Sequence, residues 1–204
     1  MSDSFKEIIA APLTLWLAPV GTAFPELGAA PGAPWFKIGT NGDKNYEQGG
    51  VTVTHSASYN KVRPAGATGA VKAFLNDEDL MFAVTLLDIS LDQYRTALNN
   101  NPITTVAAGV GTPGTKRVGL SHGMAPVNEY ALLARGQSPE FEGLQMQYCV
   151  PRCFQSGAPA PQFRKGEPAA LTIQFEALEN MTAANEQERF GFMIAGSAAA
   201  LPAG

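Results

Sequence analysis

Residues 51–87 read VTVTHSASYNKVRPAGATGAVKAFLNDEDLMFAVTLL, and this stretch decides the fold class. At its start, Val, His, Ala and Tyr alternate strictly with Thr, Ser and Asn over residues 51–60. This two-residue period is typical of a β-strand with one apolar face and one hydroxyl-bearing face. At about 3.3 Å per residue such a strand reaches about 33 Å, which is long for a small domain. The stretch therefore predicts a tall β-sheet.

A turn and two further strands are predicted next. Residues 64–69 are rich in Pro and Gly and predict the turn, and residues 71–75 predict the second strand. Residues 80–87 are apolar on both faces, which predicts a central strand that is covered on both sides. The acidic triplet Asp77-Glu78-Asp79 lies between these two segments, where it predicts a solvated hairpin tip or an acidic rim.

One helix is predicted over residues 90–98. Ser90 and Gln93 have the spacing of a capping box at its start. An apolar stripe at helical spacing should dock the helix on the sheet, and its docking residues are Leu91, Tyr94 and Leu98. The run Asn99-Asn100-Asn101-Pro102 should end the helix.

The second half of the chain repeats the β pattern. Candidate strands cover residues 116–122, 127–135, 144–154, 169–178 and 190–195. Within the third, Pro151 predicts a bulge or a sheet edge. Cys149 and Cys153 lie on the same strand, and their spacing predicts a separation of about 13 Å on one face, beyond disulfide reach. We expect two free thiols in a reducing cytoplasm.

The chain is predicted to form a single domain, residues 1–204, because it shows no internal repeat. Four stretches are predicted to lie outside the core: an N-terminal arm at 1–11, loops at 23–34 and 103–115, and a C-terminal tail at 197–204. Two interpretations of these stretches stay open. They are frayed ends and loose loops, or they become ordered only against neighbouring copies.

Candidate catalytic and metal sites fail on spacing or context. The run GVGTPG at 109–114 matches a dinucleotide-binding fingerprint, but Pro113 and a β-like segment follow where that motif needs a helix. The side chains of His55, His122, Cys149 and Cys153 lack zinc-ligand spacing. His55 lies on the apolar face of its strand and is expected in the interior or in an interface. We therefore predict no enzymatic activity, no metal and no cofactor.

The formal net charge of −4 bears on nucleic-acid contacts. A protein that binds DNA without sequence preference needs a positive field to replace phosphate counterions. The acidic balance therefore disfavours such binding. The sequence has no apolar run of bilayer-spanning length and no secretory signal, so we expect a soluble protein.

Several of these segments resemble the major tail tube proteins of long-tailed, non-contractile bacteriophages. The resemblance is carried by WFKIG at 35–39, the Thr/Val strand, the apolar strand from Leu80 and LDISLDQYRTALNN at 87–100. It extends to PLTLWLAPVGTAFPELG at 12–28 and GEPAALTIQFEALEN at 166–180, so that it covers most of the chain.

The resemblance implies a mainly β subunit, a β-sandwich or barrel-like fold with one flanking helix. Six copies would close a ring, and stacked rings would form a hollow tube through which the genome leaves the particle. Long strands would form the inner barrel. Implied partners are the tape measure, tail terminator and distal tail proteins, while DNA passes without specific binding and no membrane is involved. The location would be the virion tail, after assembly in the host cytoplasm.

Candidate residues follow from this interpretation. The hydroxyl face of the long strand would line the channel with Thr52, Thr54, Ser56 and Ser58. Charged candidates for contacts between subunits or rings are Asp77, Glu78, Asp79, Lys61 and Arg63. Two alternatives stay open: a tube protein of a contractile tail or type VI secretion apparatus, and a non-enzymatic β-sandwich module for binding or capsid decoration. A hydrolase is disfavoured because neither histidine has an evident nucleophile partner.

Overall fold

The computed structural model describes residues 8–122 and 126–198, and almost all of its regular structure is β. The strands are β1 (Thr14–Pro19), β2 (Phe36–Lys37), β3 (Tyr46–Val62), β4 (Lys72–Leu86), β5 (Ile103–Val106), β6 (Thr115–Val118), β7 (Glu129–Gln137), β8 (Gln145–Gln155), β9 (Leu171–Ala177) and β10 (Phe192–Ala195). The helical elements are η1 (Gly42–Asn45), α1 (Leu91–Thr96) and η2 (Glu186–Glu188). The predicted mainly β class with one α-helix is confirmed in the described part of the chain.

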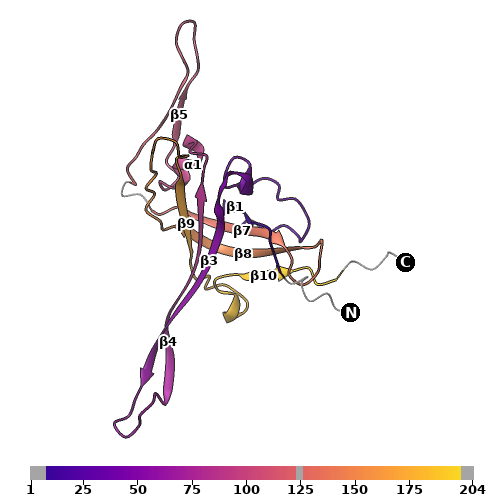
Figure 1. Ribbon diagram of the computed structural model, residues 1–204, viewed down its shortest axis with the longest axis vertical. Helices are drawn as coiled ribbons and strands as arrows, with labels where there is room; N and C mark the ends of the chain where they lie inside the picture. Colours follow the sequence, from indigo (N-terminus) through magenta and orange to yellow (C-terminus); the bar gives the residue numbers. More distant parts are fainter. Residues whose placement is uncertain (1–7, 123–125, 199–204) are drawn as a thin grey trace, which may run out of the picture.

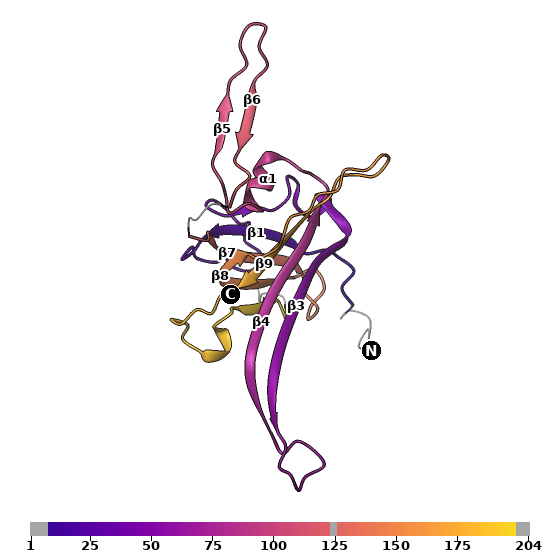
Figure 2. The same cartoon turned by 90° about the vertical axis from the view of Figure 1, so that its left-hand side faces the viewer.

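The strands form one large antiparallel sheet and one separate hairpin. The strand order in the large sheet is β2-β1-β7-β8-β9-β4-β3, with β10 added beside β8, while β5 pairs with β6. In both views β7 and β8 run across the long axis of the molecule, whereas β3 and β4 run along it (Figures 1 and 2). The sheet therefore turns through a large angle between its two halves.

The main core lies between these two halves of the sheet. Leu17 and Leu132 from the crossing half, and Phe82 and Phe175 from the lengthwise half, are 0% exposed and belong to one apolar cluster. Side chains of successive strand residues point to opposite faces, so each strand gives every second residue to this cluster. The sheet thus closes over its own apolar face as a sandwich does.

The predicted strands of the second half are found at β6 to β10, with small differences at their ends. The bulge predicted at Pro151 is present. Tyr130 pairs with Cys153 and Leu132 with Val150, so one residue of β7 stands opposite two of β8. An extra residue shifts the alternation of side chains along a strand. For this reason the two cysteines lie in different clusters, Cys149 beside Trp35 and Cys153 in the main core, and their predicted common face is wrong.

Both cysteines are free thiols, as predicted, and both are buried. Burial raises the pKa of the Cys149 thiol to about 11, and it raises the pKa of Cys153 as well. Because the thiolate is the reactive form, neither cysteine should react with an aromatic disulfide reagent at about pH 8 in the folded protein. Both should react once denaturant is added. Rapid labelling of either thiol in the native protein would contradict this packing.

The helix starts as predicted and is shorter than predicted. The Ser90 hydroxyl accepts a hydrogen bond from the Gln93 amide at 3.2 Å, and Asn99 and Asn100 have φ of 57° where the helix has ended. Leu98 is 5% exposed and Tyr94 packs against the core. Leu91 is 36% exposed, so its predicted docking role is wrong. The last turn of the helix has hydrogen bonds from residue i to residue i−3, as in a 3-10 helix. Leu98 is therefore rotated away from the position that a regular α-helix would give it, and it does not lie on the same face as Leu91.

The predicted loop at 23–34 is held by its own chain. The Arg135 guanidinium donates to the carbonyl oxygens of Glu26 and Ala29, and to the Gln147 side-chain oxygen at 2.7 Å. Gln147 in turn donates to the carbonyl oxygen of Pro25 at 2.9 Å. This loop therefore needs no neighbouring copy to be positioned. Of the predicted arm and tail, residues 1–7 and 199–204 lie outside the described residues.

Candidate assembly surfaces

The β3–β4 hairpin extends well beyond the body of the molecule (Figures 1 and 2). Its strands pair from Tyr46 and Leu86 at the body to Val62 and Lys72 at the tip. The strand β9 accompanies β4 only from Met81 to Leu86, and β3 has β4 as its single neighbour in the described sheet. Over residues 72–80 of β4, and all along β3, the outer backbone edge is consequently open.

Over residues 52–58, the part of this hairpin nearer the body, one face is largely polar and lacks basic residues. The four predicted channel-lining residues, Thr52, Thr54, Ser56 and Ser58, are all exposed on it. The Ser58 hydroxyl donates to Asp77 at 2.9 Å and the Ser56 hydroxyl to Asp79 at 3.4 Å. The register brings Thr172, Gln174 and Glu176 of β9 onto the same face. No Lys or Arg occurs in 51–58, 77–86 or 171–177, so this face carries hydroxyl, amide and carboxylate groups.

The acidic triplet does not form a hairpin tip. Asp77, Glu78 and Asp79 lie inside the continuous strand β4, opposite Ser58, Ala57 and Ser56. Prediction from sequence divided this strand in two because a run of three carboxylates is typical of a solvated turn. Here the strand stands free of the body, so its charges stay in water while the backbone remains paired. The true tip is the predicted turn at 64–69, next to Lys61 and Arg63.

Residues 80–87 are covered on one side more than on the other. Leu80, Phe82, Val84 and Leu86 are buried, whereas Met81 and Ala83 are half-buried and Leu87 is exposed. The predicted central position, between β9 and β3, is correct. The predicted cover on both sides is wrong for the single chain because the polar face described above is open to solvent.

The outer part of the hairpin exposes large apolar side chains on both faces. Tyr59 and Leu75 are paired across the strands and are 56% and 55% exposed, and Phe74 on the other face is 50% exposed. His55 is exposed as well, so of its two predicted positions the interior one is wrong, and the interface one stays a prediction. It faces away from the polar side, at a point where the crossing half of the sheet no longer covers β3. Apolar groups on both faces of a free hairpin indicate a surface that a partner covers.

The predicted loop at 103–115 is a second projecting hairpin, formed by β5 and β6. It leaves the body at the end opposite the β3–β4 tip (Figures 1 and 2). At its base Lys116 forms an ion pair with Asp92 of α1 at 3.1 Å, and near its tip Val110 is fully exposed. The Gly-rich run at 109–114 forms the turn, with an isolated bridge between Gly109 and Thr112. Residues 103–106, Ile-Thr-Thr-Val, are all β-branched, which is the sequence signal that could have indicated a strand here.

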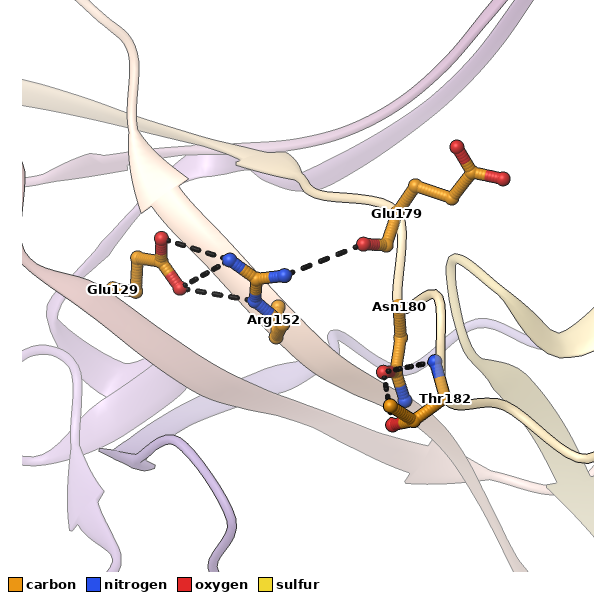
Figure 3. Close-up of polar contacts among 5 residues, drawn as sticks. All are labelled: Glu129, Arg152, Glu179, Asn180 and Thr182. Carbon is orange, nitrogen blue, oxygen red and sulfur yellow. Dashed lines mark hydrogen bonds and ion pairs between the residues drawn. The ribbon is translucent and has the colours of Figure 1, made fainter.

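A polar network holds the segment that leads to β10 (Figure 3). The bulge in β8 directs Arg152 toward Glu129, whose carboxylate accepts bonds at 2.8 and 3.0 Å. Arg152 also approaches the Glu179 carbonyl oxygen, and Arg189 pairs with the Glu179 carboxylate at 2.6 Å. These groups are about one-third exposed or more, so the network positions a surface segment and has no reactive centre.

No group of three or more His, Cys, Asp or Glu side chains suited to a metal ion occurs within residues 8–122 and 126–198. Within the same ranges no helix is long and apolar enough to span a bilayer. His55 and His122, considered above as metal ligands, are exposed, whereas both cysteines of β8 are buried.

Comparisons with known proteins give little further information. No protein-family model and no curated protein matches the sequence. Among solved structures, the chain is similar to a chain of the "Cryo-EM structure of the anti-feeding prophage (AFP) baseplate, 6-fold symmetrised", with 8% sequence identity and a TM-score of 0.38. The match covers 83% of this chain and 89% of that chain. A likeness this weak carries no argument about function.

Proposed function

We propose that the protein is a structural subunit of a bacteriophage tail tube, in which copies close into hexameric rings that stack around a channel for DNA. The observation that carries the proposal is the free β3–β4 hairpin. It has open backbone edges, exposed apolar side chains on both faces near its tip, and one face that is largely polar and free of Lys and Arg over residues 52–58.

The open edges favour assembly through strand pairing. An unpaired edge presents a row of amide and carbonyl groups that pair readily with another strand, and a closed ring removes such edges. In the proposed ring, β3 of one subunit lies beside the free edge of β4 in its neighbour. The apolar groups at Tyr59, Leu75 and Phe74 are then covered by adjacent copies.

The polar face favours a channel lining. The carboxylates of Asp77, Asp79 and Glu176 repel phosphates, and the neutral hydroxyl groups do not bind them strongly. A basic lining, in contrast, would hold DNA because phosphate counterions are released when it binds. On this proposal Thr52, Thr54, Ser56 and Ser58 face the channel. The role is structural and not enzymatic, the location is the virion tail after assembly in the host cytoplasm, and the tape measure, terminator and distal tail proteins are partners.

Two other functions are compatible with a mainly β subunit. A tube protein of a contractile tail or type VI secretion apparatus would use the same strand edges and would add contacts to a sheath. A monomeric β-sandwich module for binding or decoration would leave the hairpin edges open, which exposes the molecule to aggregation. The open edges therefore favour a tube over a decoration module.

The assembly test uses the purified full-length chain. Concentrated protein is expected to form rings or tubes with a central hole in negative-stain electron microscopy, and to sediment as a hexamer or larger species. The hydrophobic and edge contacts should persist at raised salt. Dispersed monomers at the highest soluble concentration, in both measurements, would overturn the proposal.

A further inference from the structure

We infer that the β3–β4 tip of one copy docks into a groove at the other end of the same sheet in a second copy. The groove, called here the Glu47 groove, lies where β3 begins. The inference rests on the proposed function and deepens it, because it names the two surfaces through which successive copies stack.

The tip is basic, and its cations form no ion pair within the described chain. Residues 59–76 contain three cations, Lys61, Arg63 and Lys72, and no Asp or Glu. All three are exposed, and none forms an ion pair with another described residue. Lys72 lies over the Phe74 ring, 4.7 Å from its centroid. The tip thus offers a compact positive surface with apolar side chains beside it.

The Glu47 groove has the opposite charge and open room. Three neighbouring hollows share Glu47 in their lining, and together they are lined by the carboxylates of Asp43, Glu47 and Glu167 and by one cation, Arg164. Arg164 is already paired with Glu167 at 3.5 Å, which leaves Glu47 exposed and without an ion-pair partner in the described chain. The local charge is therefore negative.

The backbone beside Glu47 departs from the regular ladder. The register of β3 against β4 shifts between Tyr46 and Val51, so residues 47–50 have no partner in that register. A Cβ atom at Gly49 or Gly50 would meet no atom within 4 Å apart from its chain neighbours. An incoming hairpin accordingly finds space and a carboxylate at one place.

A chain cannot bring its own tip to its own groove. Glu47 and Lys61 stand at opposite ends of the continuous strand β3, separated by up to about 46 Å at 3.3 Å per residue. The contact must form between copies. It joins two different surfaces, and such a heterologous contact, repeated along one direction, builds a stack.

Charge reversal tests the contact with two variants. The tip variant carries Lys61→Glu, Arg63→Glu and Lys72→Glu, and the groove variant carries Glu47→Lys and Glu167→Lys. In each variant alone, the tip and the groove carry charge of the same sign and repel each other. The concentration at which tubes form should therefore rise about tenfold or more, while rings persist. An equimolar mixture should recover tubes, because each tip then meets a groove of opposite charge when the two variants alternate.

The outcomes separate the two proposals. Recovery of tubes only in the mixture supports the inference. Tubes from both separate variants at the wild-type concentration, or no recovery in the mixture, would overturn it while leaving the proposed function intact. Absence of rings and tubes from the wild-type protein would overturn the proposed function itself. If a reversed variant fails to fold, the neutral variants Lys61→Gln with Arg63→Gln and Glu47→Gln replace it. Each should raise the concentration for tube formation by a smaller factor, and tubes at the wild-type concentration from both neutral variants would overturn the inference.

Discussion

A chain in which residues 57–78 are replaced by Asn-Gly is expected to fold normally and to lose all assembly. Ser56 and Asp79 face each other across the strands, so a two-residue turn can join them without changing the register. The removed residues are exposed, apart from the half-buried Ala67, so little core is lost. Thermal melting should therefore stay within a few degrees of wild type, and sedimentation should show monomers at every concentration tested.

A matched control keeps the whole hairpin and replaces two apolar side chains, Tyr59→Thr with Leu75→Thr. It retains the backbone edges and removes part of the apolar surface, so assembly should weaken without disappearing. Rings formed by the shortened chain at the wild-type concentration would show that the outer hairpin is not an assembly element. Unfolding of the shortened chain would show instead that the hairpin supports the body, against its lack of buried side chains.

The long hairpin was largely readable from the sequence because residues 51–60 alternate without interruption. Its continuity past Asp77 was not readable, because local pattern rules treat three carboxylates as a turn. Whether a strand tolerates them depends on how far it stands from the body, which is a property of the tertiary structure. The helix shows the same limit. Its cap at Ser90 was predictable, while the tight last turn at Ala97 and Leu98 was not.

The hydrogen bonds by which Arg135 and Gln147 hold the loop at 23–34 gave no signal in the sequence. Arg135 and Gln147 lie on neighbouring strands, and only the β7–β8 register makes them cross-strand partners. The acceptors on the loop are backbone oxygens, which no sequence motif identifies. Likewise the Glu47 groove arises from an irregular register in β3 and from chain segments distant in sequence. Sites of this kind depend on which strands pair and in what register, and periodicity alone cannot provide that.

Arg135→Met is expected to lower the free energy of unfolding by about 1 to 3 kcal/mol. The guanidinium is only 7% exposed, and all its hydrogen-bond partners given above are uncharged oxygens on Glu26, Ala29 and Gln147. Removing it leaves the buried Gln147 side-chain oxygen without its donor and frees the two backbone oxygens of the loop. Chemical denaturation followed by tryptophan fluorescence measures the loss, since Trp35 lies in the apolar cluster under this loop.

The matched control is Arg152→Met, which removes another strand arginine with a bidentate carboxylate partner. Arg152 and Glu129 are each 35% exposed, so water replaces the lost bonds and the cost should be about 0.2 to 1 kcal/mol. A second readout distinguishes release of the loop from general destabilisation. In Arg135→Met, labelling of Cys149 should become faster in the native protein, because this thiol packs in the cluster under the loop, while Cys153 in the main core stays protected. Equal costs for the two variants, or equal labelling of the two thiols, would show that Arg135 does not hold the loop.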